Sequence, residues 1–451
     1  MIYPAIKIIT NDISIKRHNG KYVNGKYIYG DDKYYIGQFK NSKPNGKGIK
    51  YFKNGNILYK GDFINGKFDG NGKCIFEYGN YYIGQFKNGL RNGKGKIYYT
   101  NGEIFYEGDF INDKLEGNGK FIFENGYYYI GQWSNNNKQG RGIIYRKNDT
   151  IKYIGYFKND KKHGYGQYNY VNGRYYIGKW LNDQKNGKGM VCCKNGKIKY
   201  SGNFVNDRYE GNGQYNYENG ECYIGQWKNN KEDGEGISYS KNNIIEYIGD
   251  FSGDKFEGYG KYIYPDGEYY IGQWSKDKKH GKGIIYYKNG NIKFIGDFVN
   301  NKFEGYGKYI FPNGEYYIGQ YLRNKKCGKG ILYYKNGDVK YIGQFLNDKF
   351  EGKGVYIFED GEYYKGQFLN DKMDGRGTLF YKNGNIKYIG SFSNDKAEGE
   401  GKYIYQDGEY YKGQFSNNNK HGEGIEYFSD GSVKYNGTFT NDIPDGYCAI
   451  I

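Results

Sequence analysis

Tyr269-Tyr270-Ile271-Gly272-Gln273-Trp274 is one copy of a short motif that recurs along the whole chain. Its core is an aromatic residue, any residue, glycine, any residue and a second aromatic residue. Side chains alternate between the two faces of a β-strand. Tyr270, Gly272 and Trp274 would therefore share one face, and Ile271 and Gln273 the other.

The residues after this motif predict that the strand folds back on itself. A polar stretch, 275–280, leads into Gly281-Lys282-Gly283, and a second strand follows at 284–287. Asn289-Gly290 then ends that strand with the strongest short hairpin signal. We expect a two-stranded antiparallel hairpin with a polar turn of about six residues at 275–280.

The hairpin repeats without interruption. The central glycine falls at 37, 61, 84, 108, 131, 155, 178, 202, 225, 249, 272, 296, 319, 343, 366, 390, 413 and 437, at intervals that alternate between 24 and 23 residues. The true period is therefore 47 residues. A lone hairpin is only marginally stable in water, so each unit must bury its aromatic face against its neighbours. The predicted fold is all-β, an elongated, twisted single-chain ribbon or solenoid of about 18 antiparallel hairpins without a helical domain.

The composition agrees with this prediction. Of 451 residues, 74 are Gly, 5 are Pro, and 20% are aromatic. Abundant glycine with almost no alanine argues against helices, and the many aromatic residues argue against disorder. We expect Gly272, Gly281 and Gly283 to leave room where large rings from neighbouring strands lie flat. We assign 1–24 to an N-terminal strand-like cap, 25–445 to the repeat array and 446–451 to a C-terminal apolar strand.

These motifs resemble the MORN repeat (membrane occupation and recognition nexus). Tyr129-Ile130-Gly131-Gln132-Trp133 followed by Gly140-Arg141-Gly142 is close to the family pattern. The resemblance implies scaffolds at membrane junctions or cytoskeletal structures, lipid binding in some members, attached enzymes in others, and dimers through C-terminal repeats in some long members. The residues that carry it best form the expected repeat core: Tyr129, Gly131, Trp133, Tyr176, Gly178, Trp180, Tyr223, Gly225, Trp227, Tyr270, Gly272 and Trp274.

The sequence offers no catalytic constellation, so we expect no enzyme activity, cofactor or metal. His163, His280 and His421 each precede the first glycine of a Gly-x-Gly pair, which favours a shared turn role over a general base or metal ligand. Cys192-Cys193 replace the aromatic pair of one second strand, where packing is favoured over redox chemistry. Cysteine usage and the start of the sequence predict an intracellular, cytoplasmic protein that is not secreted, peripheral to a membrane or to the cytoskeleton at most.

Two features are candidates for binding. The net charge of +17 and a set of basic turn residues predict one basic edge that could meet an anionic phospholipid surface, with solvated turns as the alternative. Nucleic acid is disfavoured because Arg is scarce, although exposed Tyr beside Lys can stack on single strands. The basic residues are Lys43, Lys47, Arg91, Lys94, Lys138, Arg141, Lys185, Lys188, Lys278, Lys279, Lys282, Lys325, Lys326 and Lys329.

The second feature is the apolar C-terminus, with Tyr447, Cys448, Ile450 and Ile451, which would either fold back on the last hairpin or join a homodimer. The leading functional hypothesis is a non-enzymatic scaffold that presents a repetitive β surface to protein partners. The alternatives are a peripheral membrane protein that binds anionic phospholipid, or the regulatory arm of an enzyme on another chain.

Overall fold

The computed structural model describes residues 21–23 and 26–446, and all regular structure within them is β-strand. The predicted all-β hairpin fold is confirmed, and these residues contain no helix that could cross a membrane. Most of the predicted N-terminal cap, and the residues Tyr447, Cys448, Ile450 and Ile451, lie outside the described residues.

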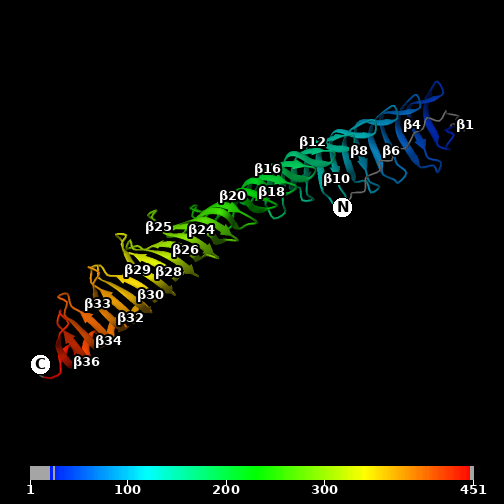
Figure 1. Cartoon of the computed structure of the whole chain (residues 1–451). Coiled ribbons are helices and arrows are strands. Elements are labelled where there is room, and N and C mark those ends of the chain that lie inside the picture. The colour runs from blue at the N-terminus through cyan, green and yellow to red at the C-terminus, as the bar shows by residue number, and fades with distance from the viewer. Residues whose placement is uncertain (1–20, 24–25, 447–451) are drawn as a thin grey trace. The chain divides into compact units, whose positions relative to one another are not determined.

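The strands fall into two units, each an antiparallel meander in which consecutive strands pair (Figure 1). The division runs through β19 (Cys222–Lys228). The other strands of the first unit are β1 (Lys21–Val23), β2 (Lys26–Ile28), β3 (Tyr34–Lys40), β4 (Lys43–Tyr51), β5 (Ile57–Ile64), β6 (Lys67–Ile75), β7 (Tyr81–Lys87), β8 (Leu90–Tyr98), β9 (Ile104–Ile111), β10 (Lys114–Ile122), β11 (Tyr128–Ser134), β12 (Asn137–Tyr145), β13 (Ile151–Lys158), β14 (Lys161–Asn169), β15 (Tyr175–Leu181), β16 (Gln184–Cys192), β17 (Ile198–Val205) and β18 (Arg208–Asn216).

The second unit repeats the same arrangement. Its strands are β20 (Lys231–Tyr239), β21 (Ile245–Phe251), β22 (Phe256–Ile263), β23 (Tyr269–Ser275), β24 (Lys278–Tyr286), β25 (Ile292–Val299), β26 (Lys302–Ile310), β27 (Tyr316–Leu322), β28 (Lys325–Tyr333), β29 (Val339–Leu346), β30 (Lys349–Ile357), β31 (Tyr363–Leu369), β32 (Lys372–Phe380), β33 (Ile386–Ser393), β34 (Lys396–Ile404), β35 (Tyr410–Ser416), β36 (Asn419–Tyr427), β37 (Val433–Thr440) and β38 (Ile443–Pro444).

The hairpin tip is shorter than the sequence predicts. β23 and β24 are joined by only two residues, Lys276 and Asp277, with φ of 50° and 65°. Positive φ at both positions is the mark of a type I′ turn, whose twist matches that of the flanking strands. The predicted six-residue turn is therefore wrong, and Lys278 and Lys279 belong to the strand.

One face of each hairpin, the inner face, is buried by a tyrosine ring. Tyr270 is 0% exposed, and a Cβ added to Gly272 or to the facing Gly283 would overlap its ring. The glycines do make room for a ring. At Gly283 the ring comes from the neighbouring strand β23, as expected, whereas at Gly272 it comes from the same strand, two residues earlier. The Tyr270 hydroxyl donates to the Gln273 carbonyl at 2.9 Å, so the buried polar group is satisfied.

The third glycine has a different role from the predicted one. Gly281 has φ of +62° and lies in a bulge, where the register between β23 and β24 shifts. The Gln273 side chain fills this bulge and accepts the Lys282 N–H at 3.0 Å. Gly281 is required for its left-handed backbone and because an added Cβ would overlap the Gln273 side chain, whose atoms are the nearest to it.

Neighbouring hairpins complete each other's burial. The Tyr270 ring meets Trp274 of its own strand at 5.2 Å and Phe298 of β25 at 5.1 Å, both edge-to-face. The Trp274 indole donates to the Gly260 carbonyl of β22 at 3.3 Å. Edge-to-face contacts of this kind add about 0.5–1.5 kcal/mol each beyond area burial. A ring is therefore sheltered only when the next hairpin is present.

Substitution of Gly283 by Ala tests the ring-over-glycine packing. The methyl group would overlap the Tyr270 ring, and overpacking of this kind costs about 1–3 kcal/mol or more. We expect urea unfolding followed by Trp fluorescence to show that loss. In the double variant Gly283→Ala, Tyr270→Ala, the methyl group meets no ring. The free energy of unfolding should therefore fall by less in the double variant than the sum of its falls in the two single variants. Strict additivity would contradict the packing.

Candidate interaction surfaces

Part of the predicted basic edge points into the protein. Arg91 is 7% exposed, its Nε lies 3.0 Å from Asp113 Oδ1, and its guanidinium lies 5.2 Å from the Phe110 ring. Lys138 is similar, because it packs between aromatic rings and pairs with Asp160 at 3.7 Å. Burial lowers the pKa of Lys138. These side chains cover the inner-face rings with their stems and cation–π contacts.

The predicted basic residues thus divide into two sets. Arg91, Lys138, Lys185, Lys279 and Lys326 lie over inner-face rings, so the expectation that they project from an edge is wrong. The remaining members are exposed, and no observation tests whether they bind an anionic surface: Lys43, Lys47, Lys94, Arg141, Lys188, Lys278, Lys282, Lys325 and Lys329.

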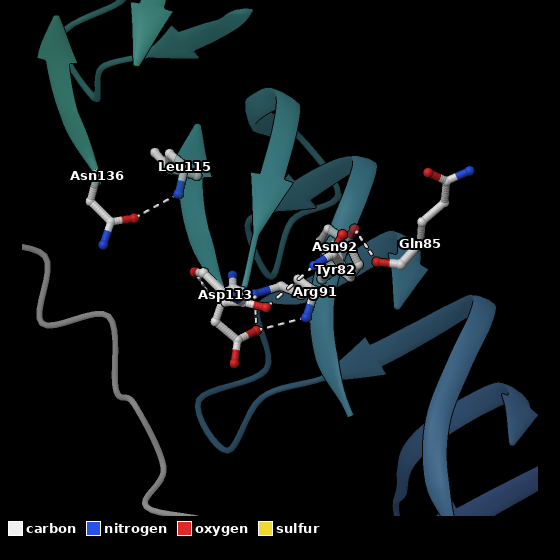
Figure 2. Close-up of polar contacts among 8 residues, drawn as sticks. Tyr82, Gln85, Arg91, Asn92, Asp113, Leu115 and Asn136 are labelled. Carbon is white, nitrogen blue, oxygen red and sulfur yellow. Dashed lines mark hydrogen bonds and ion pairs between the residues drawn. The ribbon is translucent and has the colours of Figure 1, made fainter. Parts of the chain in front are cut away.

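The hairpin tips are joined to one another by a paired hydrogen bond, which we call the tip clasp. Asp113, the second residue of one tip, donates its N–H to the Arg91 carbonyl at 3.0 Å. Its Oδ1 accepts the Arg91 N–H at 2.8 Å (Figure 2). Asn136 makes the same pair with Leu115, at 3.1 and 2.7 Å. A backbone group at one tip is therefore satisfied by the next tip along the chain.

The tip clasp recurs in both units. It joins Lys138 with Asp160, Lys162 with Asp183, Lys185 with Asp207, Tyr209 with Asn230, Glu232 with Asp254, Phe256 with Asp277, Lys279 with Asn301, Phe303 with Asn324, Lys326 with Asp348, Phe350 with Asp371, Met373 with Asp395, Ala397 with Asn418 and Lys420 with Asp442. The sequence alone assigned no role to these Asp and Asn residues. The missed signal is the recurring Asn-Asp or Asn-Asn pair, a type I′ composition.

The histidines occupy a capping position beside this clasp. In neighbouring repeats the same position holds Glu116 or Glu257, whose carboxylates accept the first N–H of the next tip, from Asn135 at 2.8 Å and Lys276 at 3.0 Å. His163 stands at that position, and its Nδ1 is buried without a hydrogen-bond partner. Among the described residues, no group of three or more His, Cys, Asp or Glu side chains is placed to hold a metal.

The opposite face of the strands, the outer face, carries an apolar ladder. Ile284 pairs in register with Ile271 and Ile295 on the two adjacent strands, and Ile331 with Ile318 and Ile342. Ile295 is 41% exposed and Ile342 is 46% exposed. Beside the ladder, stacked tyrosines such as Tyr269 and Tyr286 lie 4.6 Å apart, and Lys261 lies 4.3 Å from the Tyr269 ring.

The structure places the expected repeat core on the inner face. The four tyrosines are at most 1% exposed and the four tryptophans are 4–7% exposed: Tyr129, Tyr176, Tyr223 and Tyr270, and Trp133, Trp180, Trp227 and Trp274. Cys192 is buried and faces Tyr175, in the place of the usual stacked ring.

Two open hollows lie between tips, one lined by Gln85, Phe86 and Asn92 and the other by Gln132, Trp133 and Gln139.

The tip clasp predicts that two substitutions of Asp277 change stability by different amounts. Asp277 Oδ1 accepts the Phe256 N–H at 2.8 Å. Asp277→Gly keeps the left-handed backbone but removes the acceptor, which should cost about 1 kcal/mol and speed hydrogen exchange at the Phe256 amide. Asp277→Asn is the matched control, because Asn301 and Asn324 make the same clasp, and it should change little. Equal effects of the two substitutions would contradict the clasp.

Comparison with known structures gives fold-level likenesses that are too weak to carry an argument. The TCP10 domain of Danio rerio CPAP shares 11% identity, covers 50% of this chain and 99% of that one, and has a TM-score of 0.21. A protein of unknown function from Bacteroides caccae shares 11% identity over 56% of this chain and 90% of that one, with a TM-score of 0.13. No curated protein matches the chain.

The family comparison is decisive. The MORN repeat model matches residues 35–57, 59–81, 82–104, 106–126, 129–151, 153–173, 176–198, 200–222, 223–244, 247–269, 270–292, 294–316, 317–339, 341–363, 364–386, 388–410 and 411–433. These 17 consecutive matches agree with the hairpins, the tyrosine-over-glycine packing and the type I′ tips described above. The chain therefore belongs to the MORN repeat family.

Proposed function

We propose that this chain is a non-enzymatic scaffold that binds protein partners through its outer face. The observation that carries the proposal is the apolar ladder, in which side chains such as Ile295 and Ile342 remain more than 40% exposed. The inner face is filled by the chain's own rings, and the tips are occupied by their clasps. The outer face is thus the part of the described hairpins that is available to another molecule, and MORN repeats are known for interactions with proteins and membranes.

The ladder suits a protein surface of matching chemistry. Contiguous exposed apolar side chains bordered by polar ones are typical of protein interaction sites. Lysines stand in the same row where isoleucine is absent, as at Lys60, Lys308 and Lys365. A partner would therefore need apolar side chains that meet the isoleucines and acidic or neutral groups between them.

Replacement of two exposed ladder residues, Ile295→Lys and Ile342→Lys, tests this proposal. Lys60 occupies the equivalent position in another repeat, so the fold should tolerate the change. Affinity capture with the full chain, compared by mass spectrometry, should show a set of proteins bound by the wild type and lost from the double variant. Ile244→Lys, at an exposed loop position, is the control and should retain them. Retention by both variants would contradict the proposal.

A second candidate is binding to anionic phospholipid, favoured by exposed cations such as Lys278 and Lys282. Each Lys near an anionic surface contributes about 1 kcal/mol. The wild-type protein should then co-sediment with vesicles that contain anionic phospholipid at low salt. The double variant Lys278→Glu, Lys282→Glu should no longer co-sediment with them. Because Lys279 lies over Tyr264 and Tyr270, it is left unchanged so that the fold is preserved. Absence of co-sedimentation by the wild type would remove this candidate.

A further inference from the structure

One stretch of the outer face departs from the rest of the repeats. Five adjacent strands, β12 to β16, carry Arg141, Tyr156, Tyr165, Lys179 and Lys188 in one row, which we call the basic–tyrosine row. Arg141 pairs in register with Tyr156, and Tyr165 with Lys179. Between the other neighbours a bulge interrupts the register, and Tyr156 itself pairs with His163. Tyr156 and Tyr165 each adjoin one member of the Gly155–Gly166 pair, and Lys179 and Lys188 adjoin the Gly178–Gly189 pair in the same way. Four strand spacings separate the ends, about 19 Å.

The row replaces residues that hold the hairpin together elsewhere. At the position of Lys179, the repeats on either side carry Gln132 and Gln226, and at the position of Tyr156 two other repeats carry Asp109 and Asp250. Gln132 accepts the N–H of Arg141 at 2.9 Å, and Asp250 accepts that of Tyr259 at 3.1 Å. A lysine has no acceptor atom, and a tyrosine hydroxyl stands too far along its ring to fill the bulge. Two consecutive hairpins therefore forgo the side-chain bond that pins their bulges.

What these hairpins present instead is a line of cations and open rings. Tyr165 is 58% exposed, and Lys179 Nζ lies 5.6 Å from its ring. Tyr156 is 39% exposed, its hydroxyl accepts a hydrogen bond from Arg141 Nε at 2.8 Å, and the Arg141 guanidinium lies 5.3 Å from its ring, which leaves one ring face for a base. No carboxylate belongs to the row.

The surroundings of the row are basic as well. Lys158 and Lys161 pair in register at the tip of the middle hairpin, and both are exposed. The nearby tips carry Asp160 and Asp183, but each is paired with an inner-face lysine, at 3.7 Å and 3.6 Å. Arg141, Lys158, Lys161, Lys179 and Lys188 thus bring five positive charges to these strands, and the two tip carboxylates are each paired with a lysine of the inner face.

We propose that the basic–tyrosine row binds single-stranded nucleic acid, with phosphates on the cations and bases stacked on Tyr156 and Tyr165. Alternation of cations with exposed aromatic rings is the chemistry of single-strand recognition, since every base offers a face to stack and every linkage a charge. An acidic peptide or a lipid headgroup would use the cations but has no need of two open rings. The sequence disfavoured nucleic acid because Arg is scarce, and it did not reveal this row, because only strand pairing brings these residues together.

The second unit offers a natural control. Tyr259 and Tyr306 are as exposed as Tyr165, at 60% and 62%. Asp250 lies beside Tyr259, and Asp297 occupies the equivalent place beside Tyr306, so phosphates would be repelled there. Exposed tyrosine alone should therefore not bind, and the contrast isolates the combination of rings with cations.

Fluorescence anisotropy of the full chain with labelled oligo-dT and oligo-rU tests the proposal. We expect binding that weakens as salt rises, and a loss of about fivefold or more with Tyr165→Ala, which removes one stacking ring. Lys179→Gln restores the residue of neighbouring repeats, so it should weaken binding while thermal stability holds or rises. Tyr259→Ala should leave the affinity unchanged.

Several results would overturn the proposal. Duplex of the same length binding as tightly as the single strand would show that stacking is absent, because paired bases cannot lie on the rings. Binding that survives Tyr165→Ala, or that polyglutamate or anionic vesicles displace as well as single strands do, would show that charge alone attracts the ligand. If neither oligonucleotide binds the wild type at low salt, the proposal is overturned as well. A difference between oligo-dT and oligo-rU would identify which nucleic acid is preferred.

Discussion

The whole fold depends on a tyrosine ring that lies flat over two facing glycines. Tyr270 over Gly272 and Gly283 is one instance, and Phe294 over Gly296 and Gly307 shows that the ring matters more than its hydroxyl. A single layer of sheet has no second layer to bury its apolar face. Here the strand buries the ring against its own backbone, and the next hairpin closes the remaining side. Glycine and tyrosine are therefore abundant for one and the same reason.

The tips add a second, polar coupling between hairpins. Each tip clasp satisfies backbone groups that would otherwise face water, and it sets the spacing of consecutive hairpins at one edge. From Phe256 to Phe350 the residue held by the clasp alternates between an aromatic residue and a lysine, as at Lys279 and Phe303. In this stretch a cation lies over the inner-face rings in one hairpin and an aromatic ring is stacked there in the next, with the same 47-residue period as the sequence.

The repeat, the hairpins and the buried face follow from sequence because each depends on residues within about ten positions of one another. Which ring covers Gly272 cannot be predicted from the sequence. The alternation of side chains along a strand tells which residues share a face, but not which ring lies over the backbone. Arg91 and Lys138 were placed at an edge because lysine and arginine near a turn are normally solvated. Their place among the rings depends on aromatic residues of adjacent strands. The basic–tyrosine row is less visible still, because its ends are 47 residues apart and only strand register aligns them.

Spectrophotometric titration of the tyrosines tests the central packing most directly. Burial raises the pKa of ring-over-glycine tyrosines such as Tyr364 and Tyr411 to about 12, from an ordinary value near 10. Above pH 10 the unfolded chain therefore holds fewer protons than the folded one, and this contribution to stability, complete below pH 10, is lost as the pH rises further. The account predicts two populations of tyrosine, with solvent-exposed rings ionising near the ordinary value of about 10 and the buried rings ionising only at higher pH or together with unfolding. A single ionisation step near pH 10 with the fold intact would contradict it.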